Sequence, residues 1–131
     1  MTSKGCALIV EDDDDLRLLM SMVLDYAGYQ TTALDSAAPA LALAQHDGAP
    51  SVDVVDVRMP GMNGHALCRR LKADCRTNAP VLLVSAECSE QDIADGYDAG
   101  CDDFLPKPFH ADQLLERVER LLLPRPVEVA G

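Results

Sequence analysis

Five polar residues at the ends of short apolar runs have the side chains needed to handle a phosphoryl group. They are Glu11, Asp12, Asp56, Ser85 and Lys107. Carboxylates that lie together repel one another, and a divalent cation between them relieves that repulsion. Mg²⁺ requires only one or two carboxylates besides carbonyl and water oxygens, while a lysine and a hydroxyl can contact phosphoryl oxygens. The set therefore predicts a Mg²⁺-dependent phosphoryl site.

Asp56 is the predicted nucleophile of this site. A free aspartate has a pKa of about 3.9, so it is ionised at neutral pH, and a carboxylate can form an acyl phosphate. Taken alone, each residue of the set has an ordinary structural explanation. An acidic run complements a helix N-terminus, and a serine or lysine after a strand is commonly a turn or surface residue. The prediction depends on all five occurring together.

The elements that must position these side chains alternate between two kinds. Apolar strand-like runs lie at 7–10, 52–57 and 81–84, with weaker runs at 29–34 and 104–105. Helical spacing of apolar residues occurs at 16–27, 36–44, around 67–71 from a start near 63–64, from 89 to 100, and at 114–122. Continuous apolar strands indicate a parallel sheet that is buried on both faces.

The predicted fold class is α/β: a doubly wound (βα)5, flavodoxin-like three-layer sandwich with strand order 2-1-3-4-5. The polar run at 29–34 and the short run at 104–105 suit the two edges of the sheet. Ligands of such sheets bind at the carboxyl ends of the strands. The three carboxylates, the hydroxyl and the ammonium are therefore expected on one rim.

Composition argues against several classes of binding partner and indicates a cytoplasmic protein. The 131 residues include 11 Lys and Arg against 22 Asp and Glu, a net charge of −11, which disfavours nucleic acid and anionic membranes. No apolar run approaches the ~18–20 residues of a membrane span, and no signal peptide is apparent. Five cysteines without a C-x-x-C pair are expected to be reduced, as in a cytoplasmic protein. We expect one domain at 1–123 and a flexible tail or linker stub at 124–131.

Four motifs resemble those of the response-regulator receiver domain of two-component signalling, in particular its single-domain, chemotaxis-type form. They lie at 8–13 (Leu-Ile-Val-Glu-Asp-Asp), 56–64 (Asp-x-x-Met-Pro-Gly-x-x-Gly), 84–86 (Val-Ser-Ala) and 100–109, which contains Lys-Pro-Phe. The resemblance covers about residues 6–122. The sequence does not decide between a protein that acts alone and the receiver part of a longer chain.

The resemblance implies a role in phosphoryl transfer for each matching residue. Asp56 would be the phosphoacceptor, and Lys107 would pair with the phosphoryl oxygens. Mg²⁺ would be held by Asp12 as the closer ligand, by Glu11 through water, by Asp56 and by the backbone carbonyl of Arg58. The phosphoryl donor would be a histidine kinase or a histidine phosphotransfer protein.

The resemblance also implies a switch. Ser85 would move toward the phosphoryl group, and Phe104 would turn inward behind it. The face formed by the helix at 89–100, the strand at 104–105 and the helix at 114–122 would then change its affinity for a downstream protein, as a monomer or as a phosphorylation-dependent dimer. Arg58 and Glu87 occupy positions that tune dephosphorylation. Since their charges are opposite, we hypothesise that they pair, partly cover the site and slow the attack of water.

Two departures from the family pattern stand out. Ser51 occupies a position where the family usually has an acidic residue, and an aspartate lies inside the strand at 53. Because positions 53 and 56 differ by an odd number, Asp53 is expected on the opposite face of the sheet from Asp56. Phe104 stands where tyrosine is common, so the switch would rely on packing without a hydroxyl.

Two other functions remain open. A phosphohydrolase with an aspartate nucleophile needs a second aspartate two positions later, but that position holds Arg58, which cannot donate a proton at neutral pH. A receiver fold that no longer takes up phosphate would not require the complete site. We therefore expect a signalling switch that catalyses only its own phosphorylation and dephosphorylation. The three histidines, at 46, 65 and 110, are expected at the surface.

Overall fold

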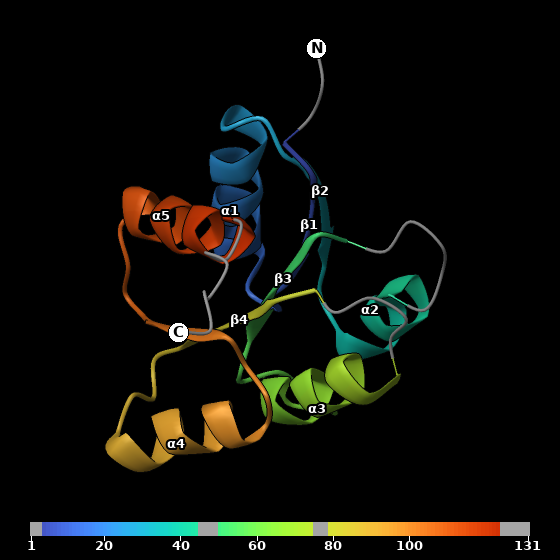
Figure 1. The fold of residues 1–131 in the computed structure, drawn as a ribbon, viewed down its shortest axis with the longest axis vertical. Helices are drawn as coiled ribbons and strands as arrows, with labels where there is room; N and C mark the ends of the chain where they lie inside the picture. The colour runs from blue at the N-terminus through green and yellow to red at the C-terminus, as the bar shows by residue number, and fades with distance from the viewer. Residues whose placement is uncertain (1–3, 45–49, 75–78, 124–131) are drawn as a thin grey trace, which may run out of the picture.

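The fold was described from a computed structural model of the chain, which covers residues 4–44, 50–74 and 79–123 (Figure 1). The strands are β1 (Cys6–Val10), β2 (Gln30–Leu34), β3 (Val52–Asp56), β4 (Val81–Ser85) and β5 (Asp103–Pro106). The helices are α1 (Asp14–Tyr26), α2 (Ala37–Ala44), α3 (Gly64–Asp74), α4 (Glu90–Asp98) and α5 (Ala111–Leu122). His46, Cys75 and the expected tail at 124–131 lie outside the described residues.

The five strands form one parallel sheet in the order β2-β1-β3-β4-β5, which confirms the predicted fold class. All residues of β3 and β4 are buried, as their continuous apolar sequences predicted. The residues of β2 are mostly exposed, as its polar sequence predicted for an edge strand. Tyr29 precedes β2 instead of beginning it, and its side chain is buried.

Helices cover both faces of the sheet and enclose two separate cores (Figure 1). Alternate strand residues point to opposite faces, so Val54 and Leu82 face α1 and α5, whereas Val55 and Leu83 face α2, α3 and the end of α4. The apolar stripes of the helices supply the other half of each core. This arrangement holds the strand ends in fixed register along the sheet.

The starts of α1 and α4 show how the sequence sets their boundaries. The Asp13 side chain accepts a hydrogen bond of 2.9 Å from the backbone N–H of Leu16 and caps α1. Ser89 and Asp92 form a reciprocal capping box at the start of α4. Both caps lie just after the loops that carry site residues, so they hold those loops at the rim of the sheet.

The described residues include no membrane-spanning helix and four free cysteines. Among the described residues, no helix combines the length and the apolarity that crossing a membrane requires. Cys6, Cys68, Cys88 and Cys101 are free thiols. Burial raises the pKa of Cys68 to about 11 and that of Cys101 to about 12. These two cysteines are therefore core residues with unreactive thiols.

Candidate functional site

The rim at the carboxyl ends of the strands brings the predicted phosphoryl-site residues together. Glu11 and Asp12 follow β1, Asp56 ends β3, Ser85 ends β4, and Lys107 follows β5. The parallel register aligns these ends, because Asp56 pairs with Val84 and Ser85 pairs with Pro106. The single rim expected from the sequence is therefore present.

Lys107 links two of the carboxylates at this rim. Its Nζ lies 2.8 Å from Oε1 of Glu11 and 3.1 Å from Oδ1 of Asp56. Burial by itself lowers the pKa of this ammonium, but the hydrogen bonds and charges of Glu11 and Asp56 outweigh burial and raise it. Lys107 therefore remains a cation held in place above the end of β3.

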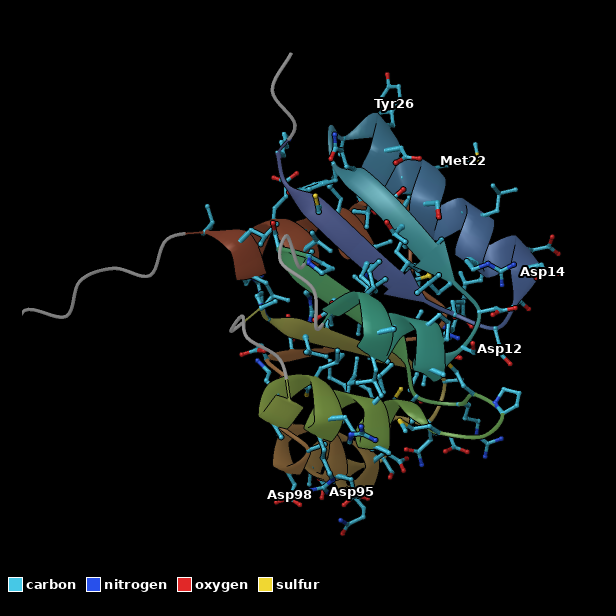
Figure 2. All side chains as sticks on the ribbon, turned by 90° about the vertical axis from the view of Figure 1, so that its right-hand side faces the viewer. Asp12, Asp14, Met22, Tyr26, Asp95 and Asp98 are labelled. Atoms are coloured by element: carbon cyan, nitrogen blue, oxygen red, sulfur yellow. The ribbon has the colours of Figure 1, made fainter. Side chains whose placement is uncertain are left out.

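The acidic residues form a candidate metal site. Glu11, Asp12 and Asp56 each offer one carboxylate oxygen, and these oxygens all lie within 4.8 Å of one another. Glu11 and Asp56 are buried, whereas Asp12 projects from the surface (Figure 2). The pKa of Glu11 is raised to about 7, chiefly by burial, because the hydrogen bond from Lys107 opposes the rise while the nearby Asp56 adds to it. A hard divalent cation would relieve this unfavourable concentration of negative charge, so the donor set fits Mg²⁺.

Backbone contacts fix the orientation of the acidic residues. The N–H of Asp13 donates to Oε2 of Glu11 over 3.2 Å, and Nη1 of Arg17 donates to the Glu11 carbonyl over 3.0 Å. A Cβ at Gly64 would lie 2.3 Å from the carbonyl oxygen of Asp56, so only glycine allows α3 to begin this close to β3. The sequence motif contains Gly64, but its spacing alone does not reveal this contact.

Ser85 and Phe104, the predicted switch residues, lie on either side of a small cavity. The Ser85 side chain is buried, and its Oγ accepts a hydrogen bond of 3.0 Å from the backbone N–H of Glu87. Phe104 is already buried, with 5% of its surface exposed. The cavity has a volume of about 10 Å³ and is lined by Val57, His65, Ser85, Glu87, Asp92 and Phe104.

Arg58 and Glu87 form the ion pair that the sequence hypothesis required. The pair lines a wider hollow of about 470 Å³, together with Asp12, Asn63 and His65. Both side chains are exposed, so the pair lies at the surface, beside Asp12.

The structure describes two of the histidines that were predicted to lie at the surface, and the prediction is correct for one and wrong for the other. His110 is exposed, as expected. His65 is instead half-buried, and its Nε2 is fully buried with no hydrogen-bond partner among the described residues. The reason is the contact of Gly64 with Asp56, which presses the first turn of α3 against the rim. No spacing in the sequence signals this contact.

Asp53 lies on the opposite face of the sheet from Asp56, as its position in β3 predicted. Only 4% of its surface is exposed, and its Oδ1 has no hydrogen-bond partner among the described residues. Burial raises the pKa of Asp53 to about 7, against the opposing charge of Lys72. Lys72 itself pairs with Asp102, at 2.6 Å. Asp53 is therefore a buried carboxyl outside the phosphoryl site, with no direct ion-pair partner in the part of the chain that the structure describes.

Known proteins are similar to this chain in both sequence and fold. The family model for the response regulator receiver domain matches residues 7–119. The transcriptional regulatory protein CseB of Streptomyces coelicolor is 33% identical over 122 residues, which are 93% of this chain and 51% of that protein. The sensory transduction protein RegX3 of Mycolicibacterium smegmatis is 36% identical over 115 residues, 88% of this chain and 49% of that protein. The chain thus spans about half the length of these curated relatives.

Solved receiver structures agree with this assignment. The chemotaxis response regulator CheY4 of Vibrio cholerae superposes with a TM-score of 0.84 at 30% identity, covering 92% of this chain and 100% of that chain. The BeF3-activated DrrB receiver domain superposes with a TM-score of 0.81 at 29% identity, covering 90% and 97%. Sequence, topology and the acidic rim all lead to one conclusion: this chain belongs to the response regulator receiver domain family of two-component systems.

Proposed function

We propose that this receiver takes up a phosphoryl group on Asp56, from the phosphohistidine of a kinase or phosphotransfer protein. The observation that carries the proposal is the position of Lys107, whose Nζ contacts both Glu11 and Asp56 beside the exposed Asp12. A cation fixed within 3.1 Å of the Asp56 carboxylate is placed to balance the charge that a phosphoryl group brings.

Each residue of the rim has a defined task in this proposal. An Asp56 oxygen attacks phosphorus as the phosphorus–nitrogen bond to the donor imidazole breaks. Lys107 contacts a phosphoryl oxygen, while Glu11, Asp12, Asp56 and the Arg58 carbonyl would hold Mg²⁺. When bound, Mg²⁺ neutralises the negative charge that develops on the phosphoryl oxygens.

The proposed output is a change in the face formed by α4, β5 and α5. Ser85 turns from the N–H of Glu87 toward the new phosphoryl oxygens, and the buried ring of Phe104 repacks into the space that the Ser85 side chain leaves. A downstream protein that binds the two forms with different affinity then reads the phosphorylation state. The same face could join two phosphorylated copies, which light scattering on the phosphorylated and unphosphorylated protein would test.

The receiver family functions as a signalling switch rather than as a classical enzyme, and two observations disfavour the rival functions for this chain. Arg58, at the position where a phosphohydrolase needs a proton donor, is a permanent cation paired with Glu87. The complete set of rim residues, with Lys107 already bridging two carboxylates, is unexpected in a module that never meets phosphate. We propose that the only catalysis is the phosphorylation and dephosphorylation of the chain itself.

Intact-mass spectrometry after incubation with acetyl phosphate and Mg²⁺ tests this function. The wild-type chain should gain one phosphoryl group, and Asp56→Asn should gain none. Asp53→Asn is a matched control, because it makes the same change three residues earlier on the opposite face, and it should gain the group normally. Phosphoryl uptake by Asp56→Asn, or its absence in the wild type, would contradict the proposal. Turnover of a phosphoester substrate would favour the phosphohydrolase instead.

A further inference from the structure

The solvent side of α1 exposes a stripe of large apolar side chains. Leu18, Met22 and Tyr26 are spaced four residues apart, so they lie on one side of the helix, and they are 61%, 59% and 97% exposed. Residues 16–24 contain a single charged residue, Arg17, in a chain whose net charge is −11. An exposed apolar patch of this kind commonly marks an interaction site.

A groove between α1 and α5 lies beside this stripe. Its volume is about 670 Å³, and its apolar walls include Leu19 and Val23 of α1 and Leu115 of α5. Tyr26 stands at the edge of the groove and projects into solvent (Figure 2). The same surface therefore carries a projecting aromatic side chain and a hollow that can receive one.

The charged residues of the groove lie at its two ends. Lys4 and Glu119 lie at the end away from the rim, where Nζ of Lys4 is 3.9 Å from Oε1 of Glu119. The N–H of Lys4 donates to the carbonyl of Gly28, just after α1 ends. Asp112 lies at the other end, in the first turn of α5, near the rim. The two ends therefore offer a cation and a carboxylate that antiparallel copies would bring together.

We propose that a second copy of this chain occupies the groove, in a two-fold dimer in which α1 and α5 of each copy face the other. Tyr26 of each copy enters the groove of the other. Lys4 of each copy then lies between its own Glu119 and Asp112 of the other copy. A two-fold interface uses one patch twice, so it needs a projection with a matching hollow, and opposite charges at opposite ends. This surface has both.

The expected area is enough for a weak but specific dimer. A tyrosine buries about 150–250 Å² when it is covered, and a two-fold interface includes it twice. With Leu19 and Met22 of each copy and the groove walls that they touch, the buried area reaches roughly 1,000 Å², the lower limit for a specific interface. Two copies of net charge −11 repel each other, so the dimer requires salt to screen that repulsion.

The dimer does not require phosphorylation of Asp56, and it leaves the α4, β5 and α5 face open. Arg117 contacts Asp103 and the carbonyl of Phe104, so this side of α5 faces β5. Leu115 and Glu119, two positions away in either direction, lie on the opposite side of the helix and line the groove. Self-association through the groove and the proposed output can therefore occur on different surfaces.

Sedimentation equilibrium of the unphosphorylated chain, at about 0.15 M salt and up to about 1 mM protein, tests the dimer. The wild type should associate, and Tyr26→Ser should weaken the association roughly tenfold or more, because it removes the central aromatic side chain. Tyr97→Ser changes a half-exposed tyrosine of α4 and should leave the association unchanged. A monomeric wild type, or equal association of the wild type and Tyr26→Ser, would overturn the inference.

Charge reversal tests the antiparallel arrangement. Lys4→Glu and Asp112→Lys should each weaken the dimer, because each places like charges opposite one another. The double variant restores opposite charges and should associate more tightly than either single variant. A double variant no tighter than the single ones would overturn the proposal. Tyr26→Ser should still gain a phosphoryl group from acetyl phosphate, so loss of the dimer is distinguishable from failure of the proposed function.

Discussion

The ammonium of Lys107 joins two carboxylates that come from β1 and β3, 96 and 51 positions earlier in the chain. The sequence predicted this meeting, because residues that follow parallel strands lie on one rim whatever their separation along the chain. It also predicted that Asp53 lies on the opposite face of the sheet from Asp56, because successive side chains of a strand point to opposite faces. The sequence could not predict that the His65 side chain is half-buried, because its burial depends on how closely Gly64 approaches Asp56.

Asp53→Asn should make the protein more stable at alkaline pH. Burial raises the pKa of Asp53 in the folded protein from an ordinary value of 3.8 to about 7. The folded state therefore holds its proton more tightly than the unfolded state, so this group's contribution to stability is full below pH 4 and lost as pH rises to 7. The gain at pH 8 should approach a limit of about 4 kcal/mol.

Urea unfolding of both proteins at pH 4 and pH 8 measures this effect. Glu11 also has a raised pKa and changes wild-type stability in the same direction, so the difference between the two proteins isolates Asp53. The variants should differ little at pH 4. An advantage of the asparagine variant that is equal at both pH values would show that Asp53 is not protonated in the folded state.

Replacing Arg58 or Glu87 by alanine should shorten the lifetime of phosphorylated Asp56. The exposed ion pair lines the hollow that contains Asp12, and we hypothesise that it restricts the approach of water to Asp56. The decay of the phosphorylated mass over time, after removal of acetyl phosphate, measures the lifetime. Arg69→Ala removes a comparable exposed pair, that with Asp98, and should leave the decay unchanged. An unaltered decay in both site variants would refute the covering role.

At the scale of elements, the sequence predicted each strand and helix within a few residues. Continuous apolar sequence predicted the buried strands. Helical spacing of apolar residues, together with caps such as Asp13 and Ser89, predicted the helices. The predicted start of the edge strand β2 was one residue too early, because the Tyr29 side chain that precedes the strand is buried like that of a strand residue. Close packing between elements, as at Gly96, leaves no periodic signal.

Gly96 in α4 sets the space available to Phe104, the proposed switch residue. A Cβ at this position would lie 3.2 Å from Cδ2 of Phe104 and 3.2 Å from Cδ1 of Leu83. Gly96→Ala should therefore displace the ring and shift its NMR signals, while phosphoryl uptake on Asp56 continues. The crowding should offset most of the ~1 kcal/mol that alanine otherwise contributes to a helix.

The control for Gly96→Ala is Ala94→Gly, which makes the reverse change at an exposed position of α4. It should weaken the helix by about 1 kcal/mol without moving the signals of Phe104. Chemical denaturation and aromatic NMR spectra of both variants provide the comparison. Unshifted Phe104 signals in Gly96→Ala would mean that the ring does not depend on this glycine.

At the scale of the whole molecule, negative charge dominates. The chain carries a net charge of −11, and the three carboxylates of the rim lie within this field. The exposed Asp12 and Asp14 extend the acidic surface to the start of α1, while Met22 and Tyr26 project from its far end (Figure 2). A cation that binds at the rim should therefore stabilise the entire fold.

Mg²⁺ should raise the midpoint of thermal unfolding relative to the protein in chelator, because a ligand of the folded state alone stabilises that state. Asp12→Asn removes one candidate ligand from the exposed side of the site and should reduce the shift. Asp15→Asn, a similar change in α1 outside the carboxylate cluster, should retain it. An equal shift in the wild type and Asp12→Asn would argue against Asp12 as a ligand.

The sheet divides the interior into two cores, and Phe104 belongs to the one that packs against α2 and α3. The core beneath α1 and α5 contains neither residue of the Ser85–Phe104 pair. A substitution beneath α1 and α5 should therefore leave the core that surrounds Phe104 intact. A substitution in the other core, which packs against α2 and α3, would instead act on the ring of Phe104 directly.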